Sequence, residues 1–299
     1  MFAAACPSDH DARDALAAIR ASGGVCVAAK AEDAGPTRIA ALAERGGYRA
    51  KFPDAAGPGL EAVVVNTGGG VAGGDRIDIV AHATAGARLT LTTATAERIY
   101  RSNGPMTTID VSLRAGKGAR LGWLPQGTIL FSGSRMRRRL TVDADPDARV
   151  LIAETLVFGR EASDEEVREG VLRDTWHVQR GGRLVFADAT RLDGDIAAEL
   201  SRPAVAAGAR TMTQLVALTP DAEPARDLAR SAIAGVDACC DIGISAWNGM
   251  LVMRALLPGL ATAQRLLREV IKALNVAAVP TAWAGDGGQR TSDLAGTRQ

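Results

Sequence analysis

Short runs in which apolar and polar side chains alternate at every second residue most constrain the fold of this chain. Ile77, Ile79 and Ala81 alternate with Asp78 and Val80, and residues 89–92 and 109–113 repeat the pattern. Successive side chains of a strand point to opposite faces, so these runs predict half-buried β-strands. Turn-forming residues separate the runs, among them Asn103-Gly104-Pro105 and Asp145-Pro146-Asp147.

Two β-hairpins are also expected. Arg180-Gly181-Gly182 separates two strand-like runs, and Asn248-Gly249 has the composition of a two-residue hairpin turn. Few helical runs lie between the strands, and no fixed sequence period emerges. The chain is therefore predicted to be mainly β, with stacked β-sheets in a solenoid-like or sandwich-like arrangement and a few helices.

Helices are expected near the two ends of the chain. Residues 9–21 predict a short helix, or else a flexible extension, and residues 224–234 predict another helix. Residues 258–274 carry a continuous apolar stripe and predict a C-terminal helix. We therefore expect an N-terminal extension over 1–36, a single β domain over 37–283 and a disordered tail over 284–299.

Composition narrows the class of protein. Lys and Arg number 35 against 34 Asp and Glu, so the chain has no basic excess of the kind that nucleic-acid binding requires. No run of 18 apolar residues predicts a membrane span, and the N-terminus lacks the pattern of a secretory signal. The four cysteines form no C-x-x-C pair and are expected to be reduced thiols in a cytoplasmic protein.

Gly68, Gly70 and Gly73 form a G-x-G-x-x-G sequence directly after an apolar run, which raises the alternative of a nucleotide-binding oxidoreductase. Such a loop must open a helix, and an acidic residue should follow about 20 positions later. Here the next residues alternate at period two, and residues 87–89 are Ala, Arg and Leu. A tight connection between strands is therefore favoured, in which Asp75 either closes a turn or has a function of its own.

Other polar groups allow less specific expectations. The basic run of Arg135 and residues 137–139 predicts a solvated strand edge. Residues 164–166 predict a surface turn, or oxygen ligands for a metal if they converge with Asp75 or Glu154. The histidines at 10, 82 and 177 lie too far apart in sequence to predict a site of several imidazoles.

Several blocks in a fixed order resemble one protein family. They read RIAALAERGGYRAKFP, VVNTGGGVAGGDRI, TATAERIYRS, ARLGWLPQGTILF, ETLVFGREA and GVLRDTWHVQRGGRLVFAD. The set is similar to the urease accessory protein family UreD, also called UreH, from about Arg38 to Trp283. The structural motif positions carried by the resemblance are Gly69, Gly70, Gly73, Gly74, Tyr100, Arg101, Pro125, Gln126, Gly159 and Arg160.

The resemblance implies a chaperone of urease maturation without catalytic activity. Proteins of this family hold UreF, and through it UreG, on the urease apoenzyme. It further implies that nickel passes transiently, that no cofactor is bound tightly, and that Asp75, Glu154 and Glu165 lie on the nickel route. A third alternative is a β-scaffold adaptor with no metal role.

Three positions depart from the family pattern. Gly127 and Ser132 stand where the family commonly has Glu and Asp, and Asp164-Glu165 replaces a usual Gly-Glu. These departures leave the expected fold and partners unchanged. They put in doubt any account in which each acidic side chain is required.

Overall fold

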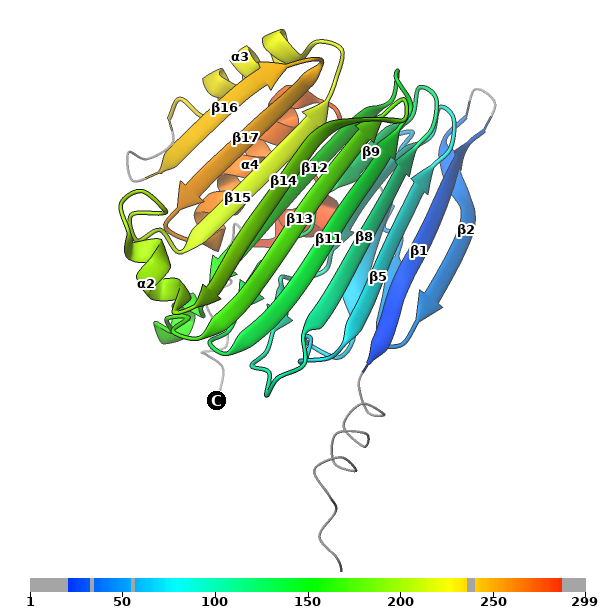
Figure 1. Ribbon diagram of the computed structural model, residues 1–299. Coiled ribbons are helices and arrows are strands. Elements are labelled where there is room, and N and C mark those ends of the chain that lie inside the picture. Colours follow the sequence, from blue (N-terminus) through cyan, green and yellow to red (C-terminus); the bar gives the residue numbers. More distant parts are fainter. Residues whose placement is uncertain (1–20, 33–34, 55–56, 236–239, 287–299) are drawn as a thin grey trace, which may run out of the picture.

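The computed structural model describes residues 21–32, 35–54, 57–235 and 240–286. Two large β-sheets stack face to face, and helices cover the far side of the second sheet (Figure 1). We name the seven-stranded sheet, uncovered in Figure 1, sheet A, and the ten-stranded sheet behind it sheet B.

Sheet A consists, in spatial order, of β14 (Arg183–Gly194), β13 (Gly170–Arg180), β11 (Ser134–Ala144), β8 (Thr107–Ala115), β5 (Arg76–Ala83), β1 (Ser22–Ala31) and β2 (Thr37–Arg45). Sheet B consists of β16 (Asp241–Trp247), β17 (Met250–Leu257), β15 (Thr211–Leu218), β12 (Arg149–Phe158), β9 (Arg120–Trp123), β6 (Arg88–Thr93), β4 (Leu60–Asn66) and β3 (Tyr48–Lys51), with β10 (Thr128–Leu130) and β7 (Glu97–Ile99) beside this path. The helical elements are η1 (Glu161–Ser163), α2 (Ile196–Ser201), α3 (Ala222–Ala232), α4 (Leu260–Leu274) and η2 (Thr281–Asp286).

The middle of the chain crosses repeatedly between the two sheets. β4, β6, β9 and β12 belong to sheet B, whereas β5, β8, β11 and β13 belong to sheet A. Because each crossing returns in the same direction, β5, β8, β11 and β13 pair in parallel. The predicted stacked, solenoid-like β fold is confirmed.

The N-terminal boundary of the domain differs from the prediction. β1 begins at Ser22 and lies inside sheet A, parallel to β5 and antiparallel to β2. The expected extension over 1–36 therefore has to be shortened, because residues 22–31 form a strand of the domain. Its alternation was missed since Val25 and Val27 are its only large apolar residues, and the other inward positions carry Gly or Ala. Residues 9–20 of the expected helix lie outside the described residues.

Both hairpins and the C-terminal helix are confirmed. β13 pairs with β14, and β16 pairs with β17 through Asn248 and Gly249, whose φ angles are 50° and 68°. These positive values explain why Asn-Gly occupies this turn. Helix α4 begins at Leu260, two residues after the expected start, and buries its apolar stripe against sheet B. Of the tail expected over 284–299, only 284–286, the end of η2, are described.

Two cores hold the layers together. The larger lies between the sheets and consists of small and branched residues such as Val27, Ile79 and Leu140. The smaller lies between sheet B and the helices. This second core corrects the expectation for β6, because Thr90 and Thr92 are buried as well as Leu89 and Leu91. A strand in the middle layer of three has no solvent-facing side.

The basic run also departs from expectation. β11 lies between β8 and β13, in the middle of sheet A, so it is not a strand edge. Arg137 and Arg139 are exposed on the outer face, whereas Arg138 points between the sheets and is 2% exposed. Alternation along the strand thus places one arginine of a surface-like run in the protein interior.

Candidate functional site: a carboxylate-lined cavity between the sheets

A cavity of about 240 Å³ lies between sheets A and B. Apolar side chains of both sheets form much of its wall, including Ile77 and Ile79 from β5 and Val64 from β4. Its polar lining comprises Tyr48, Asn66, Thr93, Thr95, Glu97, Arg98, Thr128, Arg138 and Glu154. The stacked sheets therefore enclose a space in which carboxylates face a largely apolar wall.

Three side chains from β3, β4 and β7 of sheet B form one polar cluster of this cavity. Asn66 Nδ2 donates to the two carboxylate oxygens of Glu97 at 3.0 and 3.1 Å, and Tyr48 Oη donates to Glu97 Oε2 at 3.1 Å. Asn66 Nδ2 also lies 3.0 Å from Tyr48 Oη. The three residues hold the Glu97 carboxylate in one orientation at the cavity wall.

Burial changes the proton affinity of this cluster. Desolvation raises the pKa of Glu97, and the hydrogen bonds from Asn66 and Tyr48 partly offset the rise. Desolvation also raises the pKa of Tyr48 well above its usual range, and the neighbouring charges of Glu97 and Asp75 add to the effect. Tyr48 therefore remains a hydrogen-bond donor, while Glu97 is a carboxylate that is easily neutralised by a proton or a cation.

A second polar cluster lies deeper between the sheets. Arg138 donates to Asp174 through Nε at 3.0 Å and Nη2 at 2.6 Å, and to Glu154 through Nη1 at 2.5 Å. Trp123 Nε1 donates to the other Glu154 oxygen at 2.7 Å. Burial raises the pKa of Glu154, and the Arg138 charge opposes this rise. Two carboxylates thus share one guanidinium in a setting removed from water.

Arg138 and Glu154 form a wall shared by two spaces. They line the main cavity and also a small void of about 10 Å³, which Asp174 and Asp188 line as well. Asp188 and Gln214 then belong both to this void and to a hollow of about 360 Å³. The three spaces therefore share lining residues in series between the two sheets, and the Arg138 ion pairs lie between the main cavity and the small void.

Asp75 has a structural environment. It precedes β5 and is 8% exposed, and its carboxylate oxygens accept the backbone N–H groups of Ala21 and Ala72, both at 2.8 Å. Asp75 is not among the residues that line the cavity. The negative charge of Asp75 adds to the raised pKa of Tyr48, which does line the cavity. This geometry favours the turn-closing interpretation of Asp75.

The glycine loop before Asp75 packs closely against the next segment of chain. An added Cβ would lie 2.4 Å from the Tyr100 ring at Gly70 and 2.0 Å from Ser102 Oγ at Gly73. Tyr100 Oη also donates to the Gly69 carbonyl at 2.8 Å. The loop continues into strand β5 and not into a helix. It therefore lacks the helix N-terminus that a dinucleotide site needs, and the oxidoreductase alternative loses its basis.

Glu165 lies in another part of the molecule. It pairs with Arg160 at 2.9 Å and accepts the Ser132 N–H at 3.4 Å. The Arg160 guanidinium lies 4.8 Å from the centre of the Phe131 ring, which Tyr100 meets edge-on at 5.2 Å. Glu165 thus orders the loop after η1.

Among the described residues, no three His, Cys, Asp or Glu side chains gather as metal ligands, so Asp75, Glu154 and Glu165 do not form one cluster.

The remaining motif positions lie in several loops, one of which borders the cavity. Pro125 and Gly127 line the cavity, and Gln126 Nε2 donates to the Ala94 carbonyl at 2.7 Å. Gly127 has a φ of 139°, and a Cβ there would lie 3.0 Å from Leu260 Cδ1. Arg101 pairs with Glu169 at 3.5 Å. Gly74 and Gly159 have positive φ angles of 95° and 87°.

Sequence reasoning missed most of the polar residues at this site. Tyr48, Asn66, Glu97, Arg138 and Asp174 were not predicted as a group, because they come from five separate strands or strand ends. One signal was available: Arg138 and Asp174 occupy core-facing positions of strands whose alternation was visible. A charge at a core position requires a buried partner.

Comparisons with known proteins show to which family the chain is similar. No helix in the described part of the chain is long and apolar enough to cross a membrane. The sequence profile of the family described as "UreD urease accessory protein" matches residues 22–284. This range includes β1, in agreement with the corrected domain boundary.

Individual relatives agree with the profile. The chain is 47% identical over 268 residues to "Urease accessory protein UreD" of Methylobacterium sp. (strain 4-46), covering 88% of this chain and 95% of the relative. It is 46% identical over 278 residues to the protein of the same name from Xanthobacter autotrophicus, covering 93% and 95%. Its identity to that of Azorhizobium caulinodans is 44% over 251 residues, covering 84% and 92%. With its stacked sheets, its glycine loop and this match over nearly the whole domain, the chain belongs to the UreD family of urease accessory proteins.

Proposed function

We propose that this protein is a urease maturation chaperone that acts in the cytoplasm without catalytic activity. It holds UreF, and UreG through UreF, on the urease apoenzyme and helps to deliver nickel to the urease active site. Family membership supports the role in urease maturation. The observation that carries the nickel role is the intersheet cavity with Glu97 and Glu154 in its wall.

The chemistry of the cavity suits a cation in transit. Its charged ligand atoms are carboxylate oxygens, and neither histidine nor cysteine is among its lining residues. Oxygen ligands bind nickel less tightly than sets of imidazole or thiolate groups, so an ion that enters could leave again. The raised pKa of Glu97 is consistent with a carboxylate that gains stability when a cation neutralises it.

Co-expression tests the proposal directly. The chain is produced with the urease subunits, UreF and UreG, and the complex is isolated by an affinity tag on the chain. We expect all partners to co-purify, and we expect urease produced with the chain to contain more nickel and to be more active than urease produced without it. Equal nickel content and activity in the absence of the chain would refute the proposal.

A pair of variants separates nickel guidance from a purely scaffolding role. Glu97→Gln removes the negative charge of Glu97 from the cavity wall but keeps a side chain of the same shape, and Glu269→Gln makes the same change on the exposed side of α4. We expect Glu97→Gln to assemble the complex but lower the nickel content of urease, with Glu269→Gln unchanged. Normal nickel content with Glu97→Gln would favour the β-scaffold adaptor alternative.

A further inference from the structure

The outer face of sheet A carries a band of arginines. Register aligns Arg76 on β5, Arg137 on β11, Arg173 on β13 and Arg191 on β14 in one row, with Thr108 of β8 in the row. All four arginines are exposed, and Arg139 lies one step along β11 on the same face. Neighbouring strands are about 4.8 Å apart, so each of these charges falls within about one Debye length of its nearest neighbour in the row. We call these five arginines the arginine band.

The band is incompletely neutralised within the chain. Arg173 and Arg191 both approach Asp193, at 3.8 and 3.9 Å, and so share one carboxylate. Arg76, Arg137 and Arg139 form no ion pair within the described part of the chain, and the Arg135 Nε atom at the base of β11 is buried without a hydrogen-bond partner. Like charges held side by side repel each other, so the band gains stability from an outside source of negative charge.

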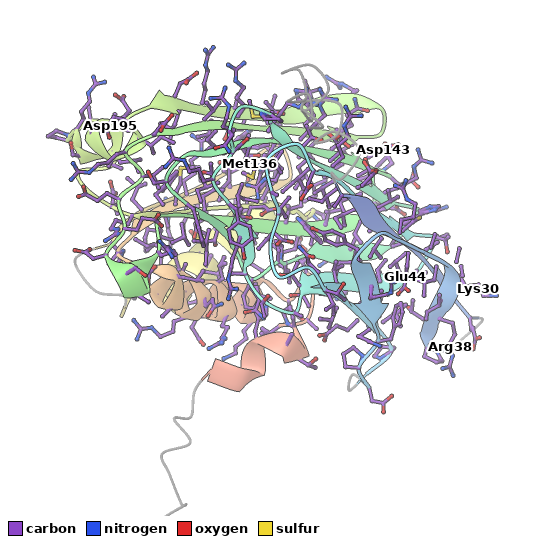
Figure 2. The ribbon with its side chains drawn as sticks, turned by 90° about the horizontal axis from the view of Figure 1, so that it is seen from below. Lys30, Arg38, Glu44, Met136, Asp143 and Asp195 are labelled. Carbon is purple, nitrogen blue, oxygen red and sulfur yellow. The ribbon has the colours of Figure 1, made fainter. Side chains whose placement is uncertain are left out.

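A hollow adjoins the band on the same face. Its volume is about 670 Å³, and short side chains form its floor, among them Cys26, Ser112 and Thr141. Leu184 lies at its margin and is 57% exposed. In Figure 2 helix α4 lies on the side of the molecule opposite sheet A, beyond sheet B, and within the described part of the chain no helix or strand covers the outer face of sheet A.

We propose that the outer face of sheet A is the docking surface for a partner protein that presents an acidic segment. Its carboxylates pair with the arginine band, and an adjacent side chain enters the hollow. Charge complementarity carries the assignment. A protein partner fits better than a nucleic acid, because Asp78, Asp110 and Asp143 lie on the same face and would repel a continuous phosphate backbone. The proposal rests on the proposed function, since it concerns how this chain engages the urease assembly.

Charge reversal tests the docking surface. The test variant is Arg137→Glu/Arg139→Glu, in which both substitutions lie at exposed positions of β11 that form no ion pair in the described part of the chain. The control, Arg265→Glu/Lys272→Glu, makes the same charge change on α4, on the other side of the molecule. Binding of each variant to purified urease apoenzyme and to purified UreF is measured at 50 and 300 mM NaCl, and thermal unfolding verifies that the variants are folded.

We expect the β11 variant to bind one of the two partners at least tenfold more weakly at 50 mM NaCl. The control should bind within twofold of the wild type, and wild-type binding to that partner should weaken at 300 mM NaCl. Equal binding of the β11 variant and the wild type to both partners would overturn the docking surface while leaving the proposed function intact. Failure of the wild type to bind either partner would refute the proposed function itself. Wild-type binding to a double-stranded DNA probe that the β11 variant loses would overturn the assignment to a protein.

Discussion

Removing the Arg138 side chain provides the sharpest test of how the intersheet site is built. Arg138 is 2% exposed and makes three charge-assisted hydrogen bonds, two to Asp174 and one to Glu154. Arg138→Met fills most of the same space but leaves two buried carboxylates without their cation. Removing one partner of a buried ion pair costs about 3–5 kcal/mol. We expect the free energy of unfolding to fall by that amount, a large share of the 5–15 kcal/mol typical of a domain.

A compensated variant distinguishes lost charge pairing from lost packing. Arg138→Met/Glu154→Gln/Asp174→Leu removes all three charges, and the amide oxygen introduced by Glu154→Gln can still accept the Trp123 N–H. Well-packed apolar replacements of buried ion pairs are often neutral or stabilising. We therefore expect the triple variant to recover most of the loss, to within about 2 kcal/mol of the wild type.

The pH dependence of the single variant gives an independent check. Burial already raises the pKa of Glu154, and loss of the guanidinium should raise it further. The native state then holds a proton that the unfolded chain releases, so stability falls as pH rises above the unfolded pKa of about 4.3. The deficit of Arg138→Met should be smaller at pH 5 than at pH 8. Urea unfolding at both pH values measures it, and a loss below about 1 kcal/mol at pH 8, or a deficit that grows on acidification, would refute the reasoning.

Three further predictions concern the loops and the cavity. Gly73→Ala should lower the free energy of unfolding by about 1–3 kcal/mol because its Cβ meets Ser102, whereas Gly243→Ala, with no atom within 4 Å, should be neutral in the same urea titration. Asp75→Ala should cost about 2 kcal/mol in thermal unfolding, since two backbone N–H groups lose their acceptor; an unchanged melting temperature would contradict the turn-closing role. Because the folded pKa of Glu97 is raised, the contribution of Glu97 to the stability of the wild type falls as pH rises above about 4.3. The stability of Glu97→Gln relative to the wild type should therefore increase between pH 4.5 and 7, and an opposite trend in melting temperature would show that the charged form is favoured.

The alternation of side chains was enough to predict the strands, the hairpins and the β character of the fold. β5 and β8 follow the expected pattern because one side of each faces the core and the other faces solvent. The pattern failed where a strand has no such asymmetry. β6 is buried on both sides, and β1 carries Gly, Ala and Val at its inward positions, so neither could be read correctly.

The candidate site was harder to predict because its residues meet only through strand pairing and sheet stacking. Glu154 was expected at the site, yet Arg138 lay within a run that resembled a solvated edge. The charges of that run alone do not show which face of the sheet is the interior; the alternating apolar residues Met136, Leu140 and Val142 of the same strand carry that signal. The parallel register of β11 and β13 places Arg138 beside Asp174, and the stacking of sheet A on sheet B brings Arg138 to Glu154 of β12.

The contact between Glu61 and the C-terminal η2 turn has a consequence for biosynthesis. Glu61 on β4 accepts hydrogen bonds from Thr281, and Trp283 Nε1 donates to Thr92 on β6. Partners of early strands are thus translated only near the end of the chain, roughly 10–45 s after Glu61 at 5–20 residues per second. During that interval β4 and β6 expose the face that residues 275–283 will cover. A nascent UreD chain must therefore remain unaggregated on the ribosome until η2 has emerged.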